Sequence, residues 1–128
     1  MGIPYPIPRR FALDQIEVIQ SSKGDITLYS NLESPVSSLS DFLDLIGNAK
    51  SDTIALKKEF FTDAFYDLKT RLAGEMLQKL SNYNKRIIII GDFENLDHKS
   101  LRDFIYESNK TGKVVFVGSL EEGIKKLQ

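Results

Sequence analysis

The chain lacks cysteine altogether and has a single histidine among its 128 residues. The absence of cysteine excludes disulfides, zinc–thiolate sites and thiol nucleophiles, and it makes a reducing cytoplasm the expected compartment. One histidine cannot supply the set of imidazole and carboxylate ligands that metal-dependent phosphoesterases distribute over many loops. We therefore expect no metal site and no cofactor.

Charge of one sign is not in excess either, since 17 basic and 18 acidic residues leave a formal net charge of −1. Such a balance provides no global field that would gather nucleic acid or an anionic membrane surface. The one basic concentration is sparse and has no interleaved aromatic residues; it consists of Lys110, Lys113, Lys125 and Lys126. We expect no nucleic-acid partner and no membrane partner.

Long apolar runs are missing, and the longest is the run of isoleucines at 87–90. A membrane-spanning helix needs roughly 20 apolar residues, so none is expected. The first ten residues carry prolines at 4, 6 and 8 and lack the apolar stretch of a signal peptide. We expect residues 1–15 to be an extended, proline-rich arm that is flexible or was introduced by cloning, and residues 16–128 to form a single domain.

Hydrophobic periodicity predicts an alternation of strands and helices. Two β-branched segments flank a polar turn with Gly24 available for positive φ, which predicts a hairpin of residues 16–20 and 26–29. Uninterrupted apolar segments predict buried strands in the middle of a sheet, and amphipathic spacing predicts the helices between them. The expected strands are 53–60, 86–92 and 113–119, and the expected helices are 38–49, 65–83, 100–112 and 119–127.

This order implies right-handed crossovers onto a largely parallel sheet. The expected fold class is α/β, with a mixed, mostly parallel sheet of about five strands covered by four helices. Residues 87–90 and 114–117 are expected at its centre. Inside the long helix, Gly74 is expected to mark a close approach of helix to strand, because glycine in a helix otherwise costs about 1 kcal/mol relative to alanine.

Three serines stand three residues before an acidic residue at the start of a helical stripe, the spacing of a capping box. They are Ser38, Ser100 and Ser119. A cap of this kind stabilises a helix by about 1 kcal/mol. This stabilisation explains a serine at the position without a catalytic role. Ser100 is therefore expected to cap its helix rather than to act as a nucleophile.

Asp92 is the first candidate for chemistry, because it follows Gly91 at the carboxyl end of a predicted parallel strand, where ligands of open α/β sheets bind. The same loop continues with oxygen and imidazole groups that could hold a divalent ion: Glu94, Asn95, Asp97 and His98. Two interpretations remain open. Asp92 is either a general base or metal ligand, or it accepts backbone hydrogen bonds within a tight turn.

The segment after the preceding strand is the second candidate, since it should leave the sheet at the same edge. Asp67, Lys69, Thr70 and Arg71 could form a polar, anion-binding rim near a helix N-terminus. The alternative is the solvated face of an amphipathic helix. A third set on the next helix, Arg102, Tyr106 and Asn109, is expected to be either a partner patch or an ordinary wet surface.

The segments "FYDLKTRLAGEMLQKLSNY", "IIIIGDF" and "KSLRDFIYESNKTG" resemble a bacterial family known as domain of unknown function 4180, over roughly residues 39–123. Tyr66 stands where the resemblance leads us to expect phenylalanine, and Arg71 where it leads us to expect glycine. The second difference puts a bulky charge in the candidate rim. The family carries no assigned activity, so the resemblance implies fold rather than reaction.

More remotely, the order of strands and helices is similar to that of STAS and SpoIIAA-like domains, which are small regulatory or ligand-binding modules. The D-x-S-G pattern of their regulatory site does not occur in this sequence. We therefore predict a STAS-like, non-enzymatic, cytoplasmic module that binds a protein partner or small ligand through loops 61–70 and 91–99. The alternative is a small, hydrolase-like enzyme that uses Asp92, and a homodimer is left open.

Overall fold

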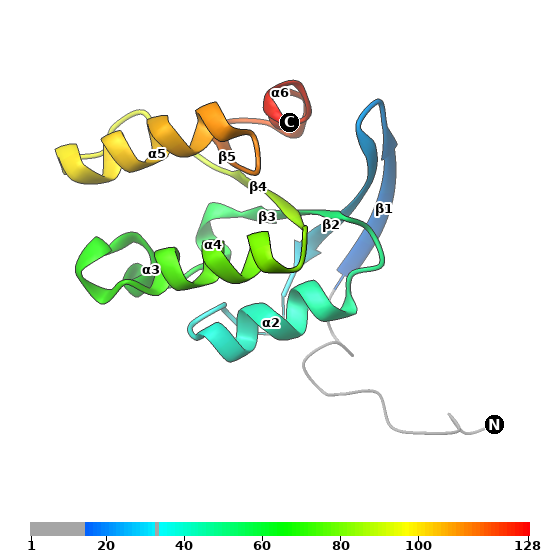
Figure 1. The fold of residues 1–128 in the computed structure, drawn as a ribbon, viewed down its shortest axis with the longest axis horizontal. Coiled ribbons are helices and arrows are strands. Elements are labelled where there is room, and N and C mark those ends of the chain that lie inside the picture. The colour runs from blue at the N-terminus through cyan, green and yellow to red at the C-terminus, as the bar shows by residue number, and fades with distance from the viewer. Residues whose placement is uncertain (1–14, 33) are drawn as a thin grey trace.

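The computed structural model describes residues 15–32 and 34–128, so most of the predicted arm lies outside the described residues. Figure 1 shows the arrangement of the helices and strands. The elements in chain order are β1 (Gln15–Ser21), β2 (Gly24–Asn31), α2 (Leu39–Asn48), β3 (Thr53–Lys57), the 3-10 turn η1 (Lys58–Phe60), α3 (Asp63–Tyr66), the 3-10 turn η2 (Leu68–Thr70), α4 (Leu72–Asn82), β4 (Arg86–Ile90), α5 (Lys99–Thr111), β5 (Val114–Val117) and α6 (Leu120–Lys126).

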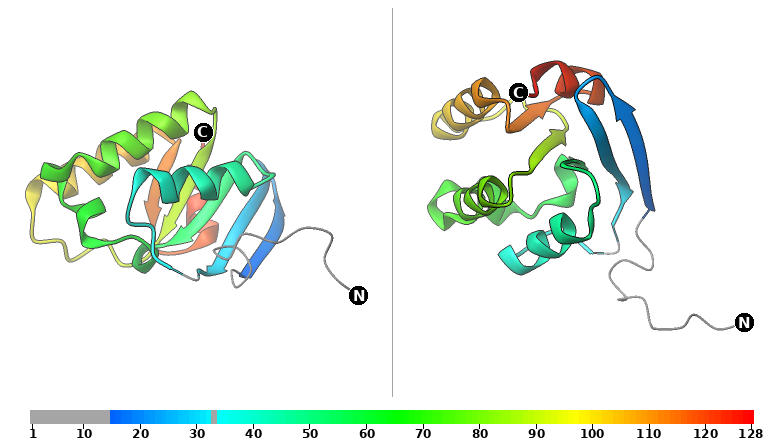
Figure 2. Two further views of the ribbon diagram at one scale, coloured as in Figure 1. Left: turned by 90° about the horizontal axis from the view of Figure 1, so that it is seen from below. Right: turned by 45° about the vertical axis from the view of Figure 1, so that its right-hand side comes forward.

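The five strands form one sheet in the order β1-β2-β3-β4-β5. β1 runs antiparallel to β2, and every other neighbouring pair is parallel. The mixed, mostly parallel five-stranded sheet is therefore confirmed. Because consecutive parallel strands are neighbours, the connecting helices α2, α4 and α5 lie on one face of the sheet, whereas α6 packs on β4 and β5 from the other (Figures 1 and 2).

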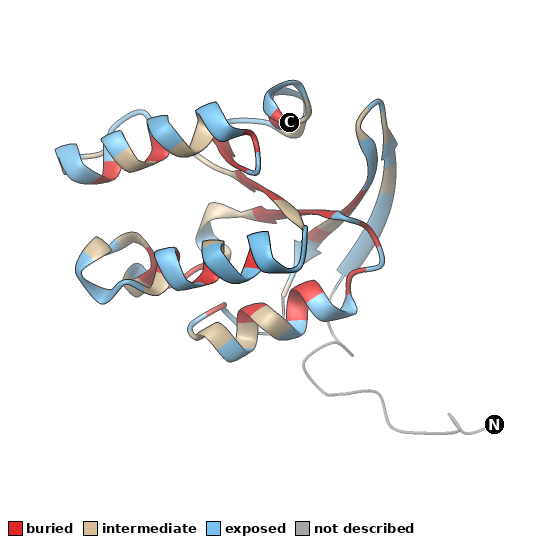
Figure 3. Cartoon of the chain, in the orientation of Figure 1, coloured by how far each residue is buried: buried red, intermediate tan, exposed pale blue. Residues whose placement is uncertain are grey.

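Both faces of the sheet are buried at β3, β4 and β5, and each face has its own apolar cluster, whereas β1 is largely exposed (Figure 3). Alternate residues of β4 serve the two clusters: Ile87 and Ile89 face α2, α4 and α5, while Ile88 faces α6. All three are fully buried. The run of isoleucines is thus explained by cover on both sides, since a strand without a solvent face has no need of polar alternation.

The expectation that residues 114–117 lie at the centre of the sheet is wrong, because β5 is an edge strand. All four of its residues are nonetheless buried. Helices α5 and α6 cover β5. The carboxamide of Asn109 pairs with its open edge: it accepts the backbone N–H of Phe116 at 2.7 Å and donates to the carbonyl of Phe116 at 3.1 Å. An edge strand covered in this way reads like a central one in the sequence.

The strand expected over 53–60 ends at Lys57, and the single helix expected over 65–83 is also wrong. Side chains satisfy backbone groups locally and break the helix after Tyr66. The carboxylate of Asp67 accepts the N–H of Lys69 at 3.1 Å, and the hydroxyl of Thr70 donates to the carbonyl of Ala64 at 2.6 Å. α4 then begins at Leu72, directly after Arg71 in the left-handed conformation (φ 63°).

Replacing Arg71 by glycine should raise the free energy of unfolding by about 0.5–1 kcal/mol. A residue with a Cβ pays roughly 1–2 kcal/mol in the left-handed region, and glycine recovers most of this after its larger loss of chain entropy. Urea denaturation of both proteins measures the difference. A less stable glycine variant would mean that the Arg71 side chain makes a stabilising contact greater than the backbone strain.

Two of the three expected helix caps are confirmed. The hydroxyls of Ser38 and Ser119 accept the N–H groups of Asp41 and Glu122 at 3.1 and 3.2 Å. Ser100 is not a cap, because a cap there would start the helix at residue 101, whereas α5 begins two residues earlier at Lys99 and has His98 at its N-cap position. The Lys99 ammonium instead pairs with the Asp103 carboxylate at 2.8 Å.

The glycines have different structural roles. Gly24 and Gly112 have positive φ, as the hairpin turn and the helix stop require. The close helix–strand approach expected at Gly74 is wrong, because a Cβ added there would meet nothing within 4 Å. That approach exists elsewhere, at Gly123 of α6.

Candidate functional site

The carboxyl ends of β3 and β4 bring the two candidate loops together. These strands are parallel neighbours, so the segments that follow them leave the sheet at one edge. A hollow of about 680 Å³ lies between α3–η2 and the first turn of α5. It is lined by Asp63, Tyr66, Asp67, Leu68, Lys69, His98, Lys99, Ser100 and Leu101.

Of the six predicted site residues, Asp67 and Lys69 line this hollow. The other four lie outside its lining: Thr70, Arg71, Asp92 and Asn95. Asp67 also supplies the turn bond that starts η2, so its carboxylate has both a structural partner and an exposed face toward the hollow. The two predicted loops lie together at one edge of the sheet, but the residues that line the hollow between them differ in part from those predicted.

Asp92 belongs to the turn after β4. Its carboxylate accepts the N–H of Glu94 at 3.0 Å, and its backbone carbonyl accepts the Lys58 ammonium at 2.6 Å. Gly91 permits this crossing, because a Cβ at that position would lie 2.4 Å from the Cβ of Lys58. Lys58 also lies over the ring of Phe93 at 5.0 Å. Of the two interpretations of Asp92, the turn-forming one matches these bonds.

Tyr66 joins the wall of the hollow to the end of β3. Its hydroxyl donates to the carbonyl of Lys58 at 2.7 Å, and its ring packs edge-on against Phe65 at 4.9 Å. Burial raises the pKa of the Tyr66 phenol, and the negative charge of Glu59 raises it further. The phenol is thus a neutral donor held in place. The sequence analysis had marked Tyr66 only as standing where the family resemblance leads us to expect phenylalanine.

His98 and Ser100 are functional candidates that the sequence interpretation had set aside. Both are exposed and line the hollow from the start of α5. No hydrogen bond joins their side chains in the described part of the chain, so they do not form a base–nucleophile pair as they stand. Within residues 15–32 and 34–128, no group of three or more histidine or acidic side chains is placed to hold a metal ion.

Charges of both signs surround the hollow, with Asp63 and Asp67 on one wall, Lys69 beside them and Lys99 opposite. Leu68 and the buried Leu101 provide the apolar part of its lining. This combination resembles the anatomy of a recognition surface, in which an apolar centre is bordered by polar groups.

The third candidate set does not act as one patch. The Asn109 carboxamide is hydrogen-bonded to the open edge of β5, and the Arg102 guanidinium donates to the carbonyl of Leu96 at 2.6 Å. Tyr106 is 62% exposed, with the Lys110 ammonium 4.4 Å from its ring centre. The expected shared outer face therefore loses Asn109, while Arg102 and Tyr106 remain exposed on it.

A protein-family model described as a domain of unknown function, DUF4180, matches residues 21–127. The chain belongs to the DUF4180 family. The match covers β2 through α6, including both walls of the hollow. No curated protein and no solved structure matches the DUF4180 chain. Similarity to STAS domains accordingly stays a prediction.

The DUF4180 helices are short. Among residues 15–32 and 34–128, none combines the length and the apolar content that crossing a bilayer demands. The longest is α5, with 13 residues. Its N-terminal turn contributes to the hollow described above.

Proposed function

We propose that this DUF4180 domain is a non-enzymatic regulatory or interaction module of the cytoplasm, and that a segment of a protein partner binds in the hollow between η2 and the start of α5. The observation that carries the proposal is the hollow itself. Two segments about 30 residues apart in sequence build it at the carboxyl edge of the sheet, where open α/β folds bind their ligands.

The side chains of the hollow support binding more than catalysis. A general base must lie within hydrogen-bond reach of the reacting proton. Asp92 lies outside the lining and accepts a turn N–H instead. The proton of Tyr66 is held by the carbonyl of Lys58.

The rim supports a protein segment over a small molecule. Asp67, Lys69, His98 and Lys99 are all exposed, so an occupant would meet charges of both signs along an open border. Exposed ion pairs contribute little affinity each but select the partner and its orientation. Leu68 and Leu101 would supply the apolar contact at the centre.

Cross-linking from one rim position tests the proposal. Benzoylphenylalanine in place of Lys69 should, after irradiation in cells, give a discrete adduct with a partner protein that mass spectrometry identifies. The same residue in place of Lys79, which is exposed on α4 and outside the hollow, is the matched control. Equal adducts from both positions, or none from position 69, would contradict the proposal. A small molecule that stays bound to the wild type in native mass spectrometry and is lost in Lys69→Glu would show that the occupant is a small ligand rather than a protein segment.

The variant Asp92→Ala separates the proposal from the hydrolase-like alternative. Loss of the bond to Glu94 should lower the free energy of unfolding by about 1 kcal/mol, measured by urea denaturation. The variant that also carries benzoylphenylalanine at position 69 should still give the adduct in cells at the wild-type yield. Loss of the adduct from a folded Asp92→Ala protein would show that Asp92 belongs to the binding site.

A further inference from the structure

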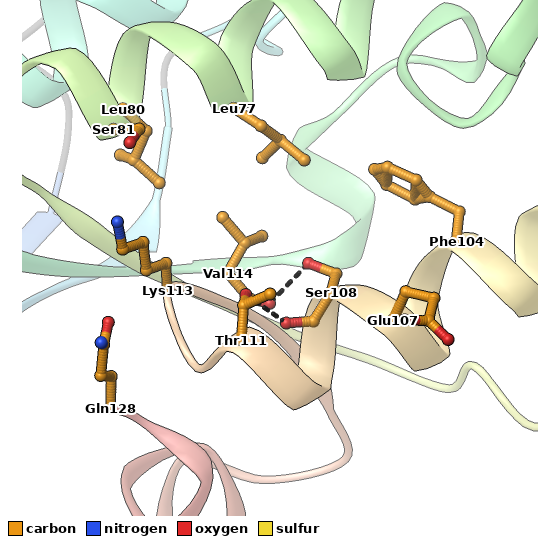
Figure 4. A pocket seen from close by; sticks show the side chains of 10 residues that line it. All are labelled: Leu77, Leu80, Ser81, Phe104, Glu107, Ser108, Thr111, Lys113, Val114 and Gln128. Carbon is orange, nitrogen blue, oxygen red and sulfur yellow. Dashed lines mark hydrogen bonds between the residues drawn. The ribbon is translucent and has the colours of Figure 1, made fainter.

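A second hollow lies at the other end of α5 (Figure 4). It has a volume of about 590 Å³ and separates the C-terminal halves of α4 and α5 above β5. Its apolar lining comes from Leu77 and Leu80 of α4, Phe104 of α5 and Val114 of β5. None of these residues lines the hollow of the proposed function.

The hollow stays open because α5 presents short side chains to it. Ser108 and Thr111 follow Phe104 at helical spacing on the same wall. The Ser108 hydroxyl donates to the carbonyl of Val114 at 2.7 Å, and the Thr111 hydroxyl donates to the carbonyl of Ser108 at 2.8 Å (Figure 4). Because both hydroxyl protons are already used within the fold, neither hydroxyl offers an occupant a free donor. The charged side chain of this wall, Glu107, has its carboxylate 3.6 Å from the Lys110 ammonium.

The apolar hollow opens at one end beside a group of cations. A smaller hollow of about 170 Å³ shares Ser81, Lys113 and Gln128 with it and adds Lys85 and Arg86. The Lys85 ammonium lies 3.9 Å from the Asp52 carboxylate and donates to the carbonyl of Ser51.

The cations at the mouth differ in how many of their donor groups already have hydrogen-bond partners. Arg86 donates to three oxygen atoms of the chain. The Lys113 side chain has no ion pair or hydrogen bond among the described residues, and it extends toward Ser81 at the mouth (Figure 4). Among the described residues, Lys113 is therefore the cation at the mouth whose ammonium donors have no partner, whereas the donors of Arg86 are engaged by oxygen atoms of the chain.

We propose that this second hollow binds a small amphipathic monoanion, a medium-chain carboxylate, with its hydrocarbon chain between α4 and α5 and its carboxylate at Lys113. The volume lies within the range of small-molecule sites, and the wall of satisfied hydroxyls matches a hydrocarbon. The Lys113 ammonium, which has no partner among the described residues, matches a single negative charge. This site is separate from the partner site at the start of α5, so either can fail without the other.

Titration of the ¹⁵N-labelled protein with decanoate tests the proposal. Amide shifts should change along residues 77–81 and 104–114, and decanoate should bind more tightly than octanoate by about tenfold, as expected for burial of two methylene groups. Lys113→Gln should weaken decanoate about fivefold while leaving decanol unchanged. Leu77→Asp, at a half-buried position, should weaken both ligands about tenfold or more.

The control variant is Lys79→Gln, which removes an exposed cation of α4 outside both hollows and should change nothing. The dispersed spectrum of each variant reports that it is folded. Absence of shifts at these helices, equal affinity for decanoate and decanol, or a Lys113→Gln affinity equal to that of the wild type would each overturn the proposal. Shifts confined to the start of α5 would overturn it as well.

Discussion

Replacing Gly123 by alanine should lower the free energy of unfolding by about 2 kcal/mol. Gly123 is buried in α6, and a Cβ there would lie 2.5 Å from Cγ2 of Ile88 and 3.2 Å from Cγ2 of Val117. Ile88 is fully buried in β4, and a β-branched side chain has few χ1 rotamers by which it could move aside. Overpacking of this kind typically costs 1–3 kcal/mol because helix and sheet must separate.

Gly74→Ala is the matched control, because it makes the same substitution in a helix where nothing lies within 4 Å. It should stabilise the protein by up to about 1 kcal/mol, which is the helix propensity of alanine over glycine. Urea denaturation followed by far-UV circular dichroism measures both. The sign difference between the two variants isolates the packing effect, and a stabilising Gly123→Ala would contradict the close approach of α6.

Combining Gly123→Ala with Ile88→Ala tests the named contact. Ile88→Ala alone should destabilise by about 2–5 kcal/mol through loss of buried volume. In that background the added methyl group of residue 123 has room, so Gly123→Ala should cost little or nothing there. Strict additivity of the two changes would show that the clash lies elsewhere.

Arg86→Met should lower the free energy of unfolding by about 3 kcal/mol. The guanidinium donates to the hydroxyl of Thr53 at 2.9 Å and to the carbonyls of Lys23 and Gln128 at 2.6 and 2.8 Å. These bonds connect β4 to β3, to the hairpin turn and to the segment after α6. Hydrogen bonds from a charged donor contribute about 1.5–3 kcal/mol each in favourable cases, and bonds that share one donor group are not additive.

Arg102→Met is the control for this variant, since Arg102 is exposed and its guanidinium donates to one backbone carbonyl, that of Leu96. It should cost less than about 1 kcal/mol. Hydrogen exchange adds a local readout: amides of the β1–β2 turn should exchange faster in Arg86→Met and not in Arg102→Met. Equal stability losses in the two variants would contradict the connecting role of Arg86.

The features of the fold that depend on local pattern were predictable from the sequence. The hairpin, the buried strand at 87–90 and the amphipathic helices follow from side-chain periodicity, and the structure places each of them near the expected residues. Gly24 and Gly112 follow from the same kind of reasoning, because positive φ is a local demand. The parallel order of the sheet follows from the alternation of strands and helices.

The errors have particular physical causes. The helix over 65–83 has the right apolar spacing, yet Asp67 and Thr70 offer the backbone other partners and divide it. β5 was expected at the centre because its residues are buried, and only the tertiary structure shows that α5, α6 and the Asn109 carboxamide replace a neighbouring strand. Hydrophobic periodicity shows which residues are buried, but not which elements of the fold bury them.

The candidate site shows the same division. The sequence by itself determined that the loops after β3 and β4 share one edge of the sheet, because parallel neighbouring strands end on the same side. Only the tertiary structure decided which side chains of those loops face one hollow: it includes His98 and Ser100, and it leaves Asp92 outside. Side-chain direction depends on where a turn closes and where a helix begins, and the N-cap of α5 lies two residues before the expected one, at His98 rather than Ser100.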